Sequence, residues 1–100
     1  MKVEPITIHW ENQFKGVMQT SSGNLLLGEQ EKGHSPYHLL LGALGSCFYA
    51  TFLTIAQKMR CSFDDAQMTL EGNKREQDVA TLDYVGIQLV IKNPSDKDKL

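Results

Sequence analysis

The segment SPYHLLLGALGSCFYATFLTIAQKMR (residues 35–60) contains the long apolar run of this chain. Ser35 is a favourable N-cap, and Pro36 suits the first helical position because its missing N–H would have no intrahelical partner there. Residues 37–56 include no Asp, Glu, Lys or Arg. The sequence therefore predicts one long helix that is apolar on every side and must be buried on every side.

The chain has 100 residues, which favours a single domain with a thin margin of stability. Much of its apolar material lies in the one helix, so little is left to wrap around it. We therefore expect a second subunit to cover part of the helix. Small side chains would permit the close approach of another backbone, such as a second copy of the helix: Gly42, Ala43, Gly45, Ser46 and Ala50.

Composition excludes several classes of protein. The net charge of −2 offers no basic excess for phosphates, which argues against nucleic-acid binding. Two cysteines are too few for a disulfide framework, so reduced thiols in a cytoplasmic protein are expected. The N-terminus lacks the apolar run of a signal peptide. Residues 37–56 have transmembrane length, but glycines, His38 and hydroxyl residues dilute them and strand-like segments flank them, so no membrane partner is expected.

Three strands are predicted before the helix. Apolar and polar residues alternate over residues 6–10, which is the period of a half-buried strand. A second strand is expected over residues 14–20. The sequence Ser-Ser-Gly-Asn at 21–24 indicates a turn, and residues 25–27 form a short third strand. A polar loop over residues 29–33 leads to the helix cap.

Two strands are predicted after the helix. Residues 66–71 alternate, 72–77 form a charged connection, and 79–91 carry apolar residues on one face, so the two runs indicate a β-hairpin. The order β-β-β-α-β-β favours an α+β fold with an antiparallel sheet and a long buried central helix. Asn-Pro-Ser at 93–95 signals another helix start. We therefore expect one domain over residues 1–100, incomplete at its C-terminus, with a helix beginning at 95–100.

Cys47 is the first candidate for chemistry, because it lies near the middle of the apolar helix. One reading is a small buried hydrophobe, since free cysteine is often fully buried. The other is a protected nucleophile, which must be a thiolate. Cys47 lies about three turns from the helix start, too far for the helix dipole to favour the thiolate, so a nearby cation or hydrogen-bond donor would be required. Cys61 is expected to be a structural or surface thiol.

Other recognised chemistries find little support in the sequence. His34 and His38 are four residues apart, but Ser35 and Pro36 lie between them, and no Cys or carboxylate stands at ligand spacing, so no metal site is expected. His38 is expected near the mouth of the cavity that the helix start borders. The sequence contains no glycine-rich phosphate loop, nucleophile elbow or paired-carboxylate constellation, and no cofactor is expected.

The stretch SPYHLLLGALGSCF, followed by an apolar helix ending in KMR, resembles the central helix of the OsmC/Ohr family of bacterial osmotically inducible and organic hydroperoxide resistance proteins. The N-terminal ITIHWENQF and the hairpin after the helix fit the same layout, so the resemblance covers roughly residues 3–95. It implies an intertwined homodimer in which each sheet wraps the partner and the two central helices pack together.

The resemblance also implies a chemistry. Family members reduce hydroperoxides, preferably organic ones, through the helix cysteine, which takes the position of Cys47 here. That thiol attacks the O–O bond and becomes a sulfenic acid; a second cysteine then forms a disulfide with it, which a dithiol reductant resets. The reactive thiolate is kept next to an arginine that a glutamate holds.

When the family's functional residues are carried over by position, the match to this sequence is incomplete. Tyr37 stands where the glutamate is expected, and the N-terminal strands contain no arginine, which leaves Lys15 as the nearest cation, a point charge without a bidentate fork. The second cysteine is expected beyond residue 100, and Cys61 is in the wrong place to substitute for it. The candidate site is therefore Cys47 with a pocket lined by Tyr37, His38, Lys15 and Phe48.

Three functions remain open from the sequence. The first is a hydroperoxide-reducing enzyme that uses Cys47. The second is a catalytically weak or inactive dimer of the same fold that holds a small apolar or amphipathic ligand, which the departures at Tyr37 and at the arginine position favour. The third is a stress-responsive protein in which Cys47 or Cys61 is oxidised without turnover.

Overall fold

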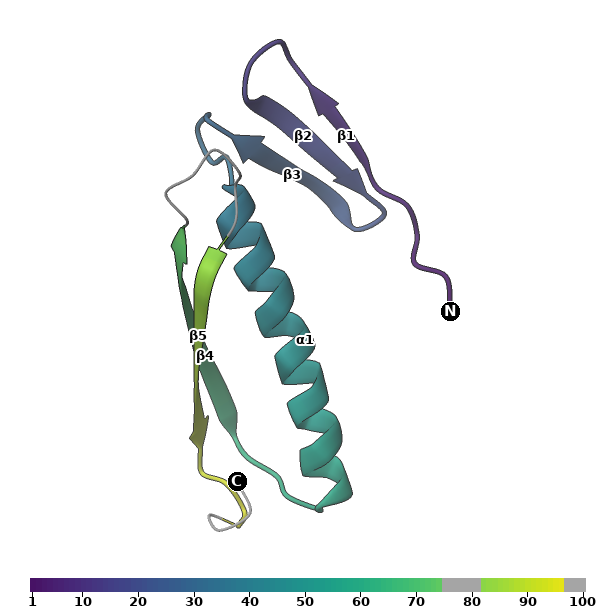
Figure 1. Cartoon of the computed structure of the whole chain (residues 1–100). Helices are drawn as coiled ribbons and strands as arrows, with labels where there is room; N and C mark the ends of the chain where they lie inside the picture. The colour runs from purple at the N-terminus through teal and green to yellow at the C-terminus, as the bar shows by residue number, and fades with distance from the viewer. Residues whose placement is uncertain (75–81, 97–100) are drawn as a thin grey trace. The chain divides into compact units, whose positions relative to one another are not determined.

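The computed structural model describes residues 1–74 and 82–96, and it has the predicted α+β order (Figure 1). The chain divides into two compact units, Met1–Leu39 and Leu40–Leu100, each taken by itself below. The elements are β1 (Thr7–Trp10), β2 (Lys15–Thr20), β3 (Gly23–Gly28), α1 (Pro36–Lys58), β4 (Asp65–Lys74) and β5 (Leu82–Lys92). All strand pairs are antiparallel, which confirms the predicted fold class.

The first unit contains a three-stranded sheet in the order β1-β2-β3. Ile8 pairs with Met18, which pairs in turn with Leu25, so one face of this sheet is apolar. Trp10 lies across its register partner Gly16, where an added Cβ would stand only 2.6 Å from the indole ring. Gly16 is therefore required for this aromatic packing, a role that the sequence pattern alone did not reveal.

Ser35 caps α1 as predicted. Its Oγ accepts the backbone N–H of His38 at 3.2 Å, and its carbonyl oxygen accepts the N–H of Leu39 at 3.1 Å. Pro36 is the first helical residue. The sequence signal for the helix start is thus confirmed because both the cap and the proline act locally, within one turn.

A Schellman motif ends α1. Arg60 adopts a positive φ of 55°, its N–H donates to the carbonyl of Gln57, and the N–H of Cys61 donates to the carbonyl of Ala56. Ala56 and Cys61 are 1% and 8% exposed, so the two residues that the longer hydrogen bond joins are both buried. Cys61 therefore lies outside the helix and has a structural role at its end.

Replacing Arg60 by glycine is expected to stabilise the protein. The left-handed conformation disfavours a residue with a Cβ, so Arg60→Gly should raise the free energy of unfolding by roughly 0.5–1 kcal/mol. Thermal denaturation would show a melting temperature several degrees higher. The matched control, Gln57→Gly inside the helix, should lower it, and a lower melting temperature for Arg60→Gly would contradict the assignment of the motif.

The second unit contains the β4–β5 hairpin beside α1 (Figure 1). Met68 pairs with Leu89 and Leu70 with Ile87, so these side chains share the face directed at the helix. β4 extends beyond the expected residue 71 to Lys74 because pairing with β5 continues there. The second of the two strands predicted after the helix was expected to begin at residue 79, and its residues 79–81 lie outside the described residues.

The residues after β5 return to the end of α1. The N–H of Ser95 donates to the carbonyl of Ser62, the N–H of Ser62 donates to the Oγ of Ser95, and Asn93 Nδ2 donates to Asp64 Oδ2. Ser95 and Asp96 are not helical. Residues 97–100 lie outside the described residues, so a helix over them stays a prediction.

Burial of α1 differs from the sequence expectation. Within the described chain only Gly45 and Ala56 of the helix are fully buried, because the hairpin covers a single face. By length and composition alone α1 could cross a bilayer, although a core helix of a soluble protein passes the same criterion. Four large side chains spaced along another face form what we call the apolar stripe: Leu40 (47% exposed), Leu44 (40%), Phe48 (45%) and Ile55 (51%).

Candidate functional site

Cys47 lies in the middle of α1, in a shallow hollow between the helix and strand β5. Leu44 and Thr51 lie three and four residues from Cys47 along the chain and therefore share its helical face, and Phe48 is its direct neighbour in the sequence. The open volume is about 480 Å³. The hollow is lined by Leu44, Cys47, Phe48 and Thr51 of α1 and by Val85 and Ile87 of β5.

The hollow is apolar, and its thiol is accessible. Cys47 is a free cysteine, and its side chain is exposed in the single described chain. None of the described residues that line the hollow is charged. Apart from the thiol, the hydroxyl of Thr51 is the one side-chain hydrogen-bonding group among them. The arrangement can hold an apolar molecule against a thiol.

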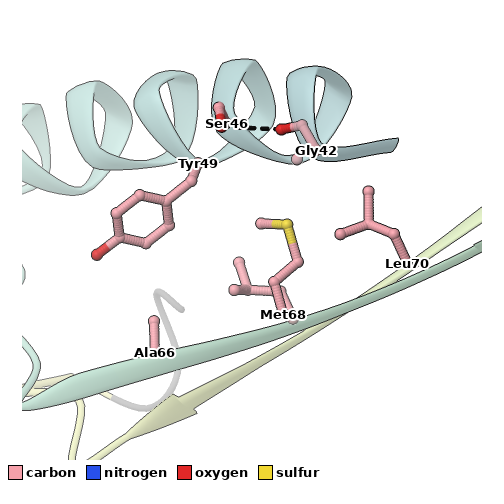
Figure 2. Close-up of a pocket in the computed structure, with 8 residues that line it drawn as sticks. Gly42, Ser46, Tyr49, Ala66, Met68 and Leu70 are labelled. Carbon is pink, nitrogen blue, oxygen red and sulfur yellow. Dashed lines mark hydrogen bonds between the residues drawn. The ribbon is translucent and has the colours of Figure 1, made fainter. Parts of the chain in front are cut away.

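A second pocket of about 350 Å³ lies between α1 and the hairpin, and Figure 2 shows Tyr49 and Met68 reaching into the space between the two. Ser46 donates its hydroxyl to the carbonyl of Gly42 at 2.8 Å on this side. A Cβ on Gly45 would approach Leu70 Cδ1 to 3.0 Å, so glycine allows the helix to pack closely. Cys47 is rotated by about 200° from Gly45, which directs it away from this pocket.

The structure brings together Cys47 and Phe48 of the predicted site residues, because both line the hollow. Tyr37 and His38 occupy the first turn of α1, about 15 Å along the axis from Cys47, and do not line it. Lys15 lies at the start of β2 in the first unit, where its Nζ is 3.8 Å from Glu11 Oε2. Both side chains are well exposed, so this ion pair contributes little.

Two further residues considered from the sequence, Cys61 and His34, take part in local structure. The Cys61 thiol is buried and donates to the carbonyl of Met59 at 3.6 Å, a weak contact. His34 joins β3 through a bridge to Leu27. In the described parts of the chain no group of three His, Cys, Asp or Glu side chains could hold a metal ion.

Sequence reasoning missed most of the hollow. Thr51 could have been identified, because it stands four residues after Cys47 and so shares its helical face. Leu44 could have been identified by the same spacing. Val85 and Ile87 could not, since they belong to a strand almost forty residues later whose register depends on tertiary packing.

Comparisons with known proteins give two findings. A family model described as "OsmC-like protein" matches residues 28–100. The crystal structure of a hypothetical protein from Aquifex aeolicus VF5 superposes with a TM-score of 0.78 at 28% sequence identity, over 91% of this chain and 67% of that one. A search of curated proteins found no match.

Proposed function

Because the chain belongs to the OsmC-like family, we propose that it reduces organic hydroperoxides with Cys47 as the attacking thiol. The family is one of stress-related hydroperoxide-resistance proteins, and its members are soluble. The observation that carries the proposal is the exposed free thiol of Cys47 in an apolar hollow at the middle of α1. An apolar wall favours the organic part of such a peroxide over water.

The reaction begins with the Cys47 thiolate. Its sulfur attacks the terminal oxygen of R–O–OH, an S–O bond forms, and the O–O bond breaks. The sulfur is oxidised by two electrons to a sulfenic acid, while the leaving alkoxide takes a proton and departs as the alcohol. A dithiol then reduces the sulfenic acid through a mixed disulfide and releases water. This chemistry suits the reducing bacterial cytoplasm, where we place the protein.

The proposal includes an intertwined homodimer. The apolar stripe leaves four large side chains between 40% and 51% exposed on one helix face, an arrangement typical of an interface rather than of free solvent. Leu44 and Phe48 belong both to the stripe and to the hollow. A second copy packed on the stripe would therefore close the open side of the hollow and exclude water from Cys47.

The test is a peroxide-consumption assay on the wild-type protein with cumene hydroperoxide and dithiothreitol. We expect peroxide loss well above that of the dithiol alone, and a slower loss when hydrogen peroxide replaces the organic substrate. Loss equal to that of dithiol alone would contradict the proposal.

A second candidate is a binding protein of the same fold that holds a small apolar ligand without turnover. The uncharged lining of the hollow and Tyr37 in place of the family's glutamate favour it. Calorimetric titration with cumyl alcohol, which has the organic group but no O–O bond, would distinguish the two. Binding by a protein that consumes no peroxide would support this alternative.

A further inference from the structure

We propose that the Thr51 hydroxyl is the hydrogen-bond donor that stabilises the Cys47 thiolate, in place of a cation, which none of the described residues that line the hollow supplies. The inference rests on the proposed function, because it concerns how the same sulfur is made reactive. Among the described residues that line the hollow, Thr51 is the one besides Cys47 whose side chain can donate a hydrogen bond.

The helix sets the geometry. Thr51 follows Cys47 by four residues, so the two Cβ atoms stand about 5–6 Å apart on one face. Both side chains line the same hollow and both are exposed to it. The Oγ1 and Sγ atoms each lie one bond beyond these Cβ atoms, so the hydrogen bond requires χ1 rotamers that direct the hydroxyl and the sulfur toward each other.

The hydroxyl is available. Two other hydroxyls of α1 are engaged with the carbonyl four residues earlier, Ser46 with Gly42 at 2.8 Å and Thr54 with Ala50 at 3.1 Å. Thr51 makes no such bond within residues 1–74 and 82–96, although it stands in the same helix. Its proton therefore remains free to be donated to a developing negative charge.

The apolar surroundings increase the effect of a single hydrogen-bond donor on the thiolate. No charged or titratable side chain other than the thiol lines the hollow within the described chain, so no formal charge there competes with the Thr51 hydroxyl for the thiolate. A hydrogen bond to a charged group is stronger than one between neutral groups, and an apolar wall strengthens it further. When the thiolate attacks the peroxide, its charge passes to the leaving oxygen, and the hydroxyl can then donate to that atom instead.

The experiment compares Thr51→Val, which keeps the shape and removes the hydroxyl, with Thr51→Ser, which keeps the hydroxyl. The matched control is Thr54→Val, since the Thr54 hydroxyl is bound to Ala50 and does not line the hollow. Alkylation of Cys47 by iodoacetamide is measured against pH in a Cys61→Ala background, and single-turnover reduction of cumene hydroperoxide is measured alongside.

We expect Thr51→Val to slow alkylation at pH 7 by about five- to tenfold and to displace the pH profile to higher pH, as loss of a hydrogen bond to a charge predicts. Thr51→Ser and Thr54→Val should stay within about twofold of the parent. Equal profiles for Thr51→Val and the parent would overturn the inference. Alkylation needs no peroxide, so a parent that is alkylated as expected but consumes no peroxide would overturn the proposed function alone.

Discussion

Replacing Cys47 by alanine is expected to reduce peroxide consumption to the rate of the dithiol alone. The thiolate is the nucleophile of the proposed step, and among the described residues that line the hollow Cys47 alone carries the sulfur that forms the S–O bond. The substitution removes one exposed sulfur, so the fold should persist with an unchanged circular dichroism spectrum. The readout is the initial rate of cumene hydroperoxide loss with dithiothreitol.

Cys61→Ala is the matched control for Cys47→Ala. Cys61 is 8% exposed, and its backbone N–H donates to the carbonyl of Ala56 in the motif that ends α1, so a peroxide in solution has little access to its sulfur. The variant should lose some stability and retain most of the turnover. The reverse pattern, with Cys61 required and Cys47 dispensable, would contradict the assignment of the attacking thiol.

Leu44→Glu is expected to dissociate the proposed homodimer. Leu44 lies within the apolar stripe, and a two-fold interface would bury the new carboxylate twice. Burying such a charge without a partner should cost about 3 kcal/mol or more, which raises the dissociation constant by over about a hundredfold. Sedimentation velocity at micromolar concentration would then show a dimer for the wild type and a monomer for the variant.

Gln67→Glu serves as the control for the change of charge. Gln67 is exposed on β4 and alternates with Ala66 and Met68, which face the helix, so it points away from the stripe. This variant should remain dimeric. A wild-type protein that sediments as a monomer, or a Leu44→Glu variant that stays dimeric, would contradict the interface.

Local signals predicted most of the fold. Ser35 and Pro36 located the helix start, because a cap depends on its own turn, and alternation located the strands, because it reflects which face is buried. The end of α1 was harder to predict. Arg60 adopts the left-handed conformation that usually requires glycine or asparagine, so the sequence held no stop signal at this position.

The site was predicted less completely than the fold. Cys47 and Phe48 are adjacent in sequence and share the hollow, whereas Tyr37 and His38 lie in the first turn of the helix, away from it. An apolar run does not show which of its faces the chain itself covers, because that depends on where the hairpin packs. The apolar stripe therefore emerged only from the structure, and its cover by a second copy stays a prediction.

The measurement that tests the central claim most directly is the trapping of sulfenic acid with dimedone, followed by mass mapping of the peptides. Wild-type protein treated with one equivalent of cumene hydroperoxide, without a reductant, should carry the adduct on the peptide containing Cys47, in proportion to the peroxide added. No adduct, or an adduct confined to Cys61, would contradict the account.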